Sequence, residues 1–334
     1  MRRNRGSNRG RNRDGTALLA VLWLSAALSA IAFTVAGTVR AETERTATEV
    51  DELRARYLAA GAIDRALLYI EWGPGHKNAD GSPKYFENPM PVLRFQFPTG
   101  SAIVEVIPES AKLNVNGAPP QELGRLLVAL GADPGRAEAI VAGIQDWRSA
   151  SDGGSFTRFD QHYLSLTPSF RARHSSFQEI EELLLVEGVT PDLFYGSYTR
   201  DAQGKLVGRA GLRDCLSVFG TQSTLDANTV QPAVMQAIGI DAASAAAIVA
   251  YRSARVIKDT QQISSFLAGS EAGGRLGVVP RSVATLRATA SLRLSNGQYS
   301  DVRRSVAALI KFLGPGYNPP YHVMRWYDSG IYVP

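Results

Sequence analysis

The sequence has almost no cysteine: Cys215 is the one cysteine among 334 residues. A single cysteine excludes an internal disulfide bond and any zinc site built mainly from cysteine ligands. Free cysteine is among the residue types most often buried in folded proteins, so we expect Cys215 to be a small apolar core residue.

Catalytic motifs are also lacking. The sequence contains no HExxH, GxSxG or phosphate-binding loop, and no family signature marks Cys215 as a nucleophile. The four histidines are dispersed along the chain; they are His76, His162, His174 and His322. We therefore expect a protein that is not an enzyme.

Excess charge of either sign is absent after the first fifteen residues. The whole chain carries a net charge of +5. Residues 1–15 hold six arginines and one aspartate, which leaves 30 of the 36 basic and 30 of the 31 acidic residues from Thr16 onward. A formally neutral folded part gives little reason to expect a nucleic-acid partner.

Charged residues are missing altogether from Thr16 to Val39. As a helix this run spans about 36 Å, and a bilayer core is about 30 Å thick. The run exceeds the apolar stretch of a signal peptide, although Val39 to Ala41 would make a passable cleavage site. The arginines before it keep the amino terminus in the cytoplasm and place the remainder across the membrane. A signal peptide, a membrane anchor and a pilin-like helix are the three alternatives.

No proline interrupts the chain from this run to Trp72, and Gly73-Pro74-Gly75 then ends the expected helix. Its second half is predicted to be amphipathic, with one apolar stripe. The stripe consists of Val50, Leu53, Tyr57, Ala60 and Leu67. A plain anchor needs no rigid extension of this kind, whereas a pilin-like subunit packs it on a globular head.

Strand patterns flank a long middle region that looks helical. Residues 92–107 predict two strands around a Pro-Thr-Gly turn, and residues 291–311 predict a hairpin on Asn296-Gly297. Residues 321–328 look like a last strand. The expected fold class is α+β, with a long amino-terminal helix packed on a small antiparallel sheet and a large inserted α-helical domain.

The middle region contains an internal repeat that begins at Leu113 and again at Leu225. Each copy is a predicted helix–hairpin–helix unit, with an asparagine N-cap, a proline in the first turn and a glycine in the hairpin. The corresponding residues are Asn116 and Asn228, Pro120 and Pro232, and Gly131 and Gly239. Residues 176–194 form a third, partial copy with Gly188 in its hairpin.

Several motifs in this order resemble the K-type minor pseudopilins of type II secretion systems (GspK). They are "RDGTALLAVLWLSAAL", "SAKLNVNGAPPQEL", "SFQEIEELLLVEGVTPDLF", "LDANTVQPAVMQAIGI" and "YHVMRWYD", and they cover nearly the whole chain. The resemblance implies that a prepilin peptidase cuts after Gly15 and methylates Thr16. It further implies a non-enzymatic subunit at the pseudopilus tip that initiates assembly and supports protein export across the outer membrane.

The resemblance also implies partners, location and domain limits. The expected partners are the I, J and H types of minor pseudopilin, the prepilin peptidase and the inner-membrane assembly platform. The expected location is the bacterial inner membrane, crossed once, with the carboxy-terminal domain in the periplasm and then at the pseudopilus tip. The expected parts are a leader (1–15), the helix (16–72), a first sheet region (73–112), the helical insertion (113–282, with repeats near 113–148, 176–196 and 225–255) and the return strands (283–334).

Ala20 occupies the fifth position after the expected cut. Most pilin-like subunits carry glutamate there, which can neutralise the buried terminal ammonium of the subunit ahead, because unpaired charge in lipid is expensive. A subunit with nothing ahead of it does not need that glutamate. Ala20 therefore agrees with a place at the tip, although alanine is also an ordinary lipid-facing residue.

Bound calcium is a further implication of the resemblance, in the loop after the first repeat. The carboxylates of this loop are Asp146, Asp152 and Asp160. Calcium takes six to eight oxygen ligands, so three scattered acids make a poor site, and we expect a solvated loop rather than a metal site.

A membrane-anchored DNA receptor is the rival function, because helix–hairpin–helix units often hold phosphates on hairpin amides. The second hairpin, "IGIDAASAAAIV", has no basic residue and carries Asp241. This composition disfavours DNA binding.

Overall fold

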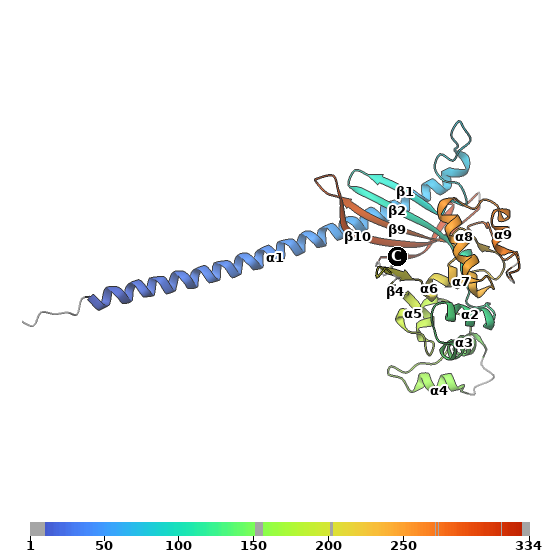
Figure 1. Cartoon of the computed structure of the whole chain (residues 1–334), viewed down its shortest axis with the longest axis horizontal. Coiled ribbons are helices and arrows are strands. Elements are labelled where there is room, and N and C mark those ends of the chain that lie inside the picture. The colour runs from blue at the N-terminus through green and yellow to red at the C-terminus, as the bar shows by residue number, and fades with distance from the viewer. Residues whose placement is uncertain are drawn as a thin grey trace, which may run out of the picture. The chain divides into compact units, whose positions relative to one another are not determined.

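The computed structural model describes residues 11–150, 156–200, 203–270, 272, 274–314 and 316–328, with the side chains described from Thr16 onward. The chain forms two compact units, Met1–Arg54 and Ala55–Pro334. Helix α1 (Arg11–Trp72) contributes to both, and each unit is considered by itself (Figure 1).

In the first unit the described chain is the helix alone. Its apolar side chains are exposed, with Leu18 at 70%, Trp23 at 74% and Phe33 at 87%. Beyond Val39 the helix becomes polar, and ion pairs such as Arg40–Glu44 (3.1 Å) and Arg45–Glu49 (3.2 Å) join residues one turn apart. Such exposed pairs each contribute about 0.3–0.5 kcal/mol. The first unit therefore changes from apolar to charged along one continuous helix.

In the second unit, α1 packs on the sheet through a stripe of small residues. The predicted stripe is largely wrong: Tyr57 is 69% exposed, and Val50 and Leu53 in the first unit are also exposed, while Leu67 is buried. The buried positions are Ala55, Ala59, Ala62, Ile63, Ala66 and Leu67. Alanine at the contact lets the helix approach the sheet closely. The predicted stripe was wrong because the periodicity of large apolar residues gives such alanines little weight. The helix then ends at the 3₁₀ turn η1 (Gly73–Gly75).

The sheet has five antiparallel strands in the order β1-β2-β9-β10-β11. They are β1 (Val92–Phe97), β2 (Gly100–Pro108), β9 (Val283–Arg293), β10 (Tyr299–Phe312) and β11 (Tyr321–Tyr327). The predicted hairpins and the predicted last strand are confirmed. Alternate residues of β9, from Ala284 to Ala290, join the buried cluster under α1. The expected α+β class, with a long helix on an antiparallel sheet, is thus confirmed.

Between β2 and β9 the chain forms a mainly helical module with its own core. Its helices are α2 (Pro120–Ala129), α3 (Pro134–Arg148), α4 (Arg158–Leu164), α5 (Pro191–Tyr195), α6 (Leu212–Cys215), α7 (Pro232–Ala237), α8 (Ala242–Ala254) and α9 (Ser264–Leu267). Its short 3₁₀ helices are η2 (Glu109–Ala111), η3 (Ile180–Leu185) and η4 (Thr260–Ile263). The helices of the two repeats meet where α2 packs against α7.

The module also contains short strands, which the sequence patterns did not predict. Two-residue parallel pairs join β3 (Leu113–Asn114) to β6 (Leu216–Ser217) and β7 (Leu225–Asp226) to β8 (Leu276–Gly277). A further antiparallel hairpin consists of β4 (Ser197–Arg200) and β5 (Leu206–Arg209). Two-residue strands lack the length for a periodic pattern, so only the packing of the repeats brings them together.

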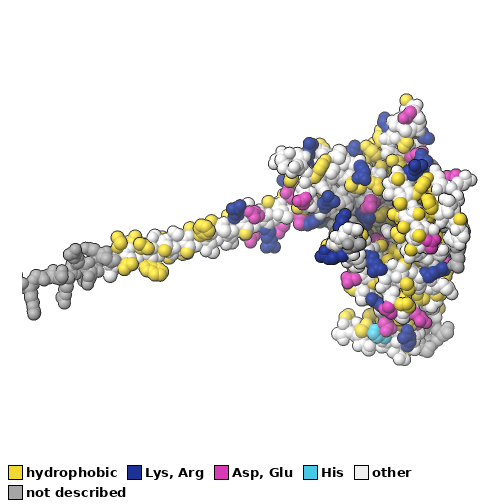
Figure 2. Space-filling model, viewed as in Figure 1, with side chains coloured by type: hydrophobic (Ala, Val, Ile, Leu, Met, Phe, Trp, Pro, Cys, Tyr) yellow, Lys and Arg dark blue, Asp and Glu magenta, His cyan; other side chains and the backbone are white. Residues whose placement is uncertain are grey.

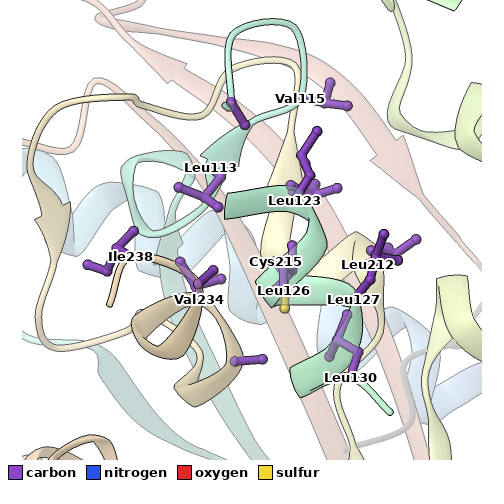
Figure 3. Close-up of a cluster of buried hydrophobic side chains, with 14 of the residues drawn as sticks. Leu113, Val115, Leu123, Leu126, Leu127, Leu130, Leu212, Cys215, Val234 and Ile238 are labelled. Atoms are coloured by element: carbon purple, nitrogen blue, oxygen red, sulfur yellow. The ribbon is translucent and has the colours of Figure 1, made fainter. Parts of the chain in front are cut away.

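Apolar side chains from both repeats and from the segment between them fill the core of the module (Figure 3). Leu113 and Leu123 come from the first repeat, Val234 and Ile238 from the second, and Cys215 lies among them. Cys215 is fully buried, as predicted from the usual burial of free cysteine.

Candidate functional site

The first candidate site is the start of α1, where processing and membrane insertion were predicted. Gly15 lies within the helix but in the stretch 11–15 whose side chains fall outside the described part, while Thr16 and Ala20 are exposed. Among the described residues one helix, Thr16–Gly75, is long and apolar enough to cross a membrane, with a most apolar window of mean hydropathy 2.2. This helix fits the predicted anchor. Cleavage after Gly15, methylation of Thr16 and the role of Ala20 stay predictions.

The second candidate is the acidic loop. Two of its three predicted metal ligands, Asp146 and Asp160, meet at His174, and Asp152 lies outside the described residues. His174 Nε2 is 2.9 Å from Asp160 Oδ2, and its Nδ1 is 3.2 Å from the main-chain oxygen of Asp146. Asp160 is fully buried, so this is an internal ion pair at the end of α3 and start of α4 rather than a solvated loop.

Burial and pairing act in opposite directions on these groups. Burial by itself raises the pKa of Asp160, but hydrogen bonds from His174 and the Thr157 amide outweigh it, so that pKa lies below its ordinary value. Burial by itself lowers the pKa of His174, but the hydrogen bond and charge of Asp160 outweigh it, so that pKa is raised. Both directions favour a charged imidazolium–carboxylate pair.

These residues do not fit a calcium ion. Within the described chain no three acidic, histidine or cysteine side chains come together in a way that could hold a metal. The imidazolium of His174 instead occupies the position between Asp146 and Asp160 where a cation would bind. Calcium needs six to eight oxygens, and a positive charge among the ligands opposes it.

The third candidate is the pair of helical repeats, which share a hydrogen-bond pattern that sequence reasoning missed. Asn116 and the backbone of Phe177 exchange two hydrogen bonds, at 2.7 and 3.0 Å. Asn228 and the backbone of Ile257 do the same in the second repeat, at 2.8 and 2.9 Å. Each asparagine therefore ties the start of its repeat to the chain that follows the second helix.

The predicted role of these asparagines as N-caps is wrong. Pro119 and Gln231 occupy the N-cap positions of α2 and α7 without side-chain caps. A cap accepts from the second or third amide of its own helix, which requires adjacency, and each asparagine lies three residues before its N-cap position.

Arginines complete the same pattern at the ends of the second helices. Arg148, from the last turn of α3, donates to the carbonyl oxygens of Val115 (2.8 Å) and Ala118 (3.0 Å). Arg252, from α8, donates to those of Ala227 (3.0 Å) and Val230 (2.7 Å). These carbonyls flank the paired asparagines in both repeats, so the two units are equivalent in detail. Both guanidinium groups therefore make hydrogen bonds within the repeats and do not face a ligand site.

The hairpins of the repeats are poorly suited to phosphate. Asp133 caps α3 by accepting from the amide of Arg136, and Asp241 caps α8 by accepting from the amides of Ala243 and Ser244. Carboxylates thus occupy the helix amino termini where an anion would bind. Gly131 and Gly239 have positive φ values of 86° and 96°, which supports their predicted place after a helix end.

The fold and sequence resemble known secretion proteins. Residues 104–195 match the family "Type II secretion system (T2SS), protein K". The chain is 28% identical over 197 residues to the type II secretion system protein K of Pectobacterium carotovorum subsp. carotovorum, covering 54% of this chain and 60% of the relative. It is 25% identical over 201 residues to that of Klebsiella pneumoniae, covering 54% and 59%. The matched part thus spans about 60% of the length of these relatives.

A solved structure has the same fold. A chain in the crystal structure of the GspK-GspI-GspJ complex from enterotoxigenic Escherichia coli aligns with a TM-score of 0.52 and 19% identity, covering 84% of this chain and 98% of that one. The family match, the two relatives and this fold agree with the motifs of the sequence. The chain is similar to the protein K family of type II secretion systems in sequence over its middle part and in fold over most of its length.

Proposed function

We propose that this protein is a minor pseudopilin: a non-enzymatic subunit that inserts α1 in the inner membrane and then enters a type II secretion pseudopilus. The observation that carries the proposal is the helix itself. Its uncharged run from Thr16 to Val39 suits a bilayer, and its continuation packs on the sheet through Ala59, Ala62 and Ala66. The same helix therefore supplies both the membrane segment and the helix that packs on the sheet of the head domain.

The amino terminus of this subunit is prepared by a prepilin peptidase, which cuts after Gly15 and methylates Thr16. Removal of the leader discards its six arginines, the positive charge that orients the helix in the membrane. The carboxy-terminal part is then in the periplasm and the helix is free to leave the bilayer during assembly.

The subunit stands at the pseudopilus tip, starts assembly and assembles with the I, J and H types of minor pseudopilin. Support comes from Ala20, which cannot neutralise the terminal ammonium of a subunit ahead of it. The solved complex with the similar chain also contains GspI and GspJ, so we expect the I and J types of minor pseudopilin as partners of this subunit. The assembly platform of the inner membrane receives the subunit before incorporation.

Co-expression of the full chain with a prepilin peptidase tests the leader assignment. Intact-mass analysis of the membrane fraction is expected to find a chain that begins with N-methylated Thr16. A Gly15→Ala chain should stay unprocessed. An unshortened wild-type chain, or a Gly15→Ala chain trimmed as efficiently, would refute the assignment.

Deletion of the gene in its own bacterium tests the function. Loss of secreted proteins from the medium, with their accumulation in the periplasm, is expected, and the wild-type gene should restore secretion. Normal secretion in the deletion strain would refute the proposed role.

A further inference from the structure

The β4–β5 hairpin is the most exposed secondary structure of the helical module. Seven of its eight strand residues are exposed. Three of these are large apolar side chains: Tyr198 at 48%, Leu206 at 56% and Val207 at 44%. A two-stranded hairpin that buries little apolar surface is marginally stable in water. A surface of this kind indicates contact with another molecule.

The base of the hairpin is nevertheless firmly built into the module. Phe194 and Leu212, just before and after it, are fully buried. Gly196, with φ of 90°, and Gly211 pack so closely that a Cβ atom on Gly196 would lie 2.3 Å from the carbonyl oxygen of Arg209. Only glycine fits such a junction. The hairpin therefore projects from a defined base.

The two faces of the hairpin differ. The register pairs Tyr198 with Gly208 and Arg200 with Leu206, which places Tyr198, Arg200 and Leu206 on one face. Arg209 lies on the other face, and its guanidinium covers Gly131 in the first repeat. The second face thus contacts the module at Arg209, and Tyr198, Arg200 and Leu206 on the first face are exposed.

The hairpin region is basic, although residues 16–334 as a whole are formally neutral. Residues 197–213 contain four basic residues, Arg200, Lys205, Arg209 and Arg213, and one acidic residue. Figure 2 shows dark-blue side chains gathered where Figure 1 places β4. A positive surface favours partners of negative charge.

The outer edges of both strands are also free of strand partners, because β4 and β5 form a two-stranded sheet within the described chain. An extended peptide can bind such an edge through main-chain hydrogen bonds, with alternate side chains supplying specificity. An isolated edge of this kind is otherwise a hazard for non-specific pairing.

We propose that the β4–β5 hairpin binds an extended, acidic segment of a partner protein, which adds as a third strand. The segment lies beside β5, where its apolar side chains cover Leu206 and, across Gly208, Tyr198. Carboxylates of the segment pair with Arg200, whose guanidinium also donates to the Gly204 oxygen at 2.8 Å, and with Lys205. This proposal does not depend on the peptidase cut or on the position of the subunit in the pseudopilus.

Site-specific photo-crosslinking of the full chain in its own bacterium tests the proposal. A photoreactive benzoylphenylalanine replaces Leu206 in one strain and Leu164, which is 42% exposed on α4, in a control strain. Leu206 is expected to give a protein adduct, and sequencing of the cross-linked peptide is expected to find at least two carboxylates. An adduct with lipid alone, or a yield no higher than at Leu164, would overturn the proposal.

Charge reversal then tests the chemistry of the contact. Arg200→Glu with Lys205→Glu should lower the adduct yield at least tenfold, and replacing the partner's carboxylates by lysines should restore it. Lys77→Glu with Lys84→Glu makes the same charge change in an exposed loop outside the hairpin and should leave the yield unchanged. An unchanged yield in the first variant, with a thermal unfolding curve like that of wild type, would also overturn the proposal.

Discussion

Asn228 and Ile257 exchange two hydrogen bonds across 29 positions of the chain: the side-chain amide donates to the Ile257 oxygen at 2.9 Å and accepts from its N–H at 2.8 Å. Asn116 and Phe177 repeat the relationship across 61 positions. These long-range bonds hold each repeat closed.

Asn228→Ala should lower the free energy of unfolding by about 2–4 kcal/mol, because a buried N–H and a buried carbonyl lose their partners. Denaturant unfolding of the full chain measures the change. Asn296→Ala, in the exposed turn between β9 and β10, should change it by less than about 0.5 kcal/mol. Equal effects would contradict the assigned role of Asn228.

Gly131→Ala should destabilise the protein by about 1–2 kcal/mol, because its φ of 86° disfavours a side chain and the new Cβ would meet the Arg209 guanidinium. Gly124→Ala, within α2 and facing open space, should instead stabilise it by about 0.5–1 kcal/mol. Opposite signs in thermal unfolding check the pair, and a stabilising Gly131→Ala would refute the strain argument.

Ala62→Leu should cost about 1–3 kcal/mol, since the added atoms must enter the closed contact between α1 and the sheet. Tyr57→Ala changes an exposed residue of the same helix and should cost less than about 0.5 kcal/mol. If Tyr57→Ala proved the more damaging change, the originally predicted apolar stripe would be the correct one.

The His174–Asp160 pair should make stability depend on pH in two directions. The raised pKa of His174 gives a contribution that is complete below the ordinary histidine pKa and is lost as pH rises through the folded value. The lowered pKa of Asp160 gives one that is complete above the ordinary aspartate pKa and is lost as pH falls through the folded value.

The stability difference between wild type and His174→Gln should therefore be largest at mildly acidic pH, between these two pKa ranges, and should shrink above neutrality. Denaturant unfolding at several pH values measures the difference. The carboxylate of Asp146 and the guanidinium of Arg171 act on the same pair, so the control for general charge effects is Arg94→Gln, an exposed residue of β1. A difference independent of pH would show that the pair is not charged.

Calcium should leave the melting temperature unchanged, whether it is added or removed with a chelator. The physical reason is that the imidazolium of His174 lies between Asp146 and Asp160 and opposes a cation there. If calcium did bind, it would stabilise the folded state by mass action and raise the melting temperature. Differential scanning calorimetry with calcium and with magnesium checks this, and a calcium-specific rise would indicate a site not foreseen here.

Local chemistry was readable from the sequence. Gly73-Pro74-Gly75 predicted the end of α1, Asn296-Gly297 predicted the β9–β10 turn, and the repeated Gly131 and Gly239 predicted two helical hairpins. Each signal acts within a few residues, through a fixed φ, a missing N–H or a missing side chain, so no distant contact is needed to interpret it.

Other features were decided by packing between distant segments. The sequence around Asn116 and Asn228 is typical of N-caps, but in the folded chain these side chains bind the backbone of Phe177 and Ile257. Asp160 was predicted to lie in a solvated loop, but in the folded chain it is buried and pairs with His174.

By itself, then, the sequence determined the membrane-length apolar run, the basic residues 1–15 that hold all the excess charge, the two hairpins of the sheet and the repeat. The tertiary structure decided which face of α1 is buried, which polar side chains form hydrogen bonds or ion pairs inside the fold, and which hairpin is left exposed. The physical reason is range: propensity and periodicity act between neighbours, whereas desolvation and long-range hydrogen bonds exist only once the chain has closed on itself.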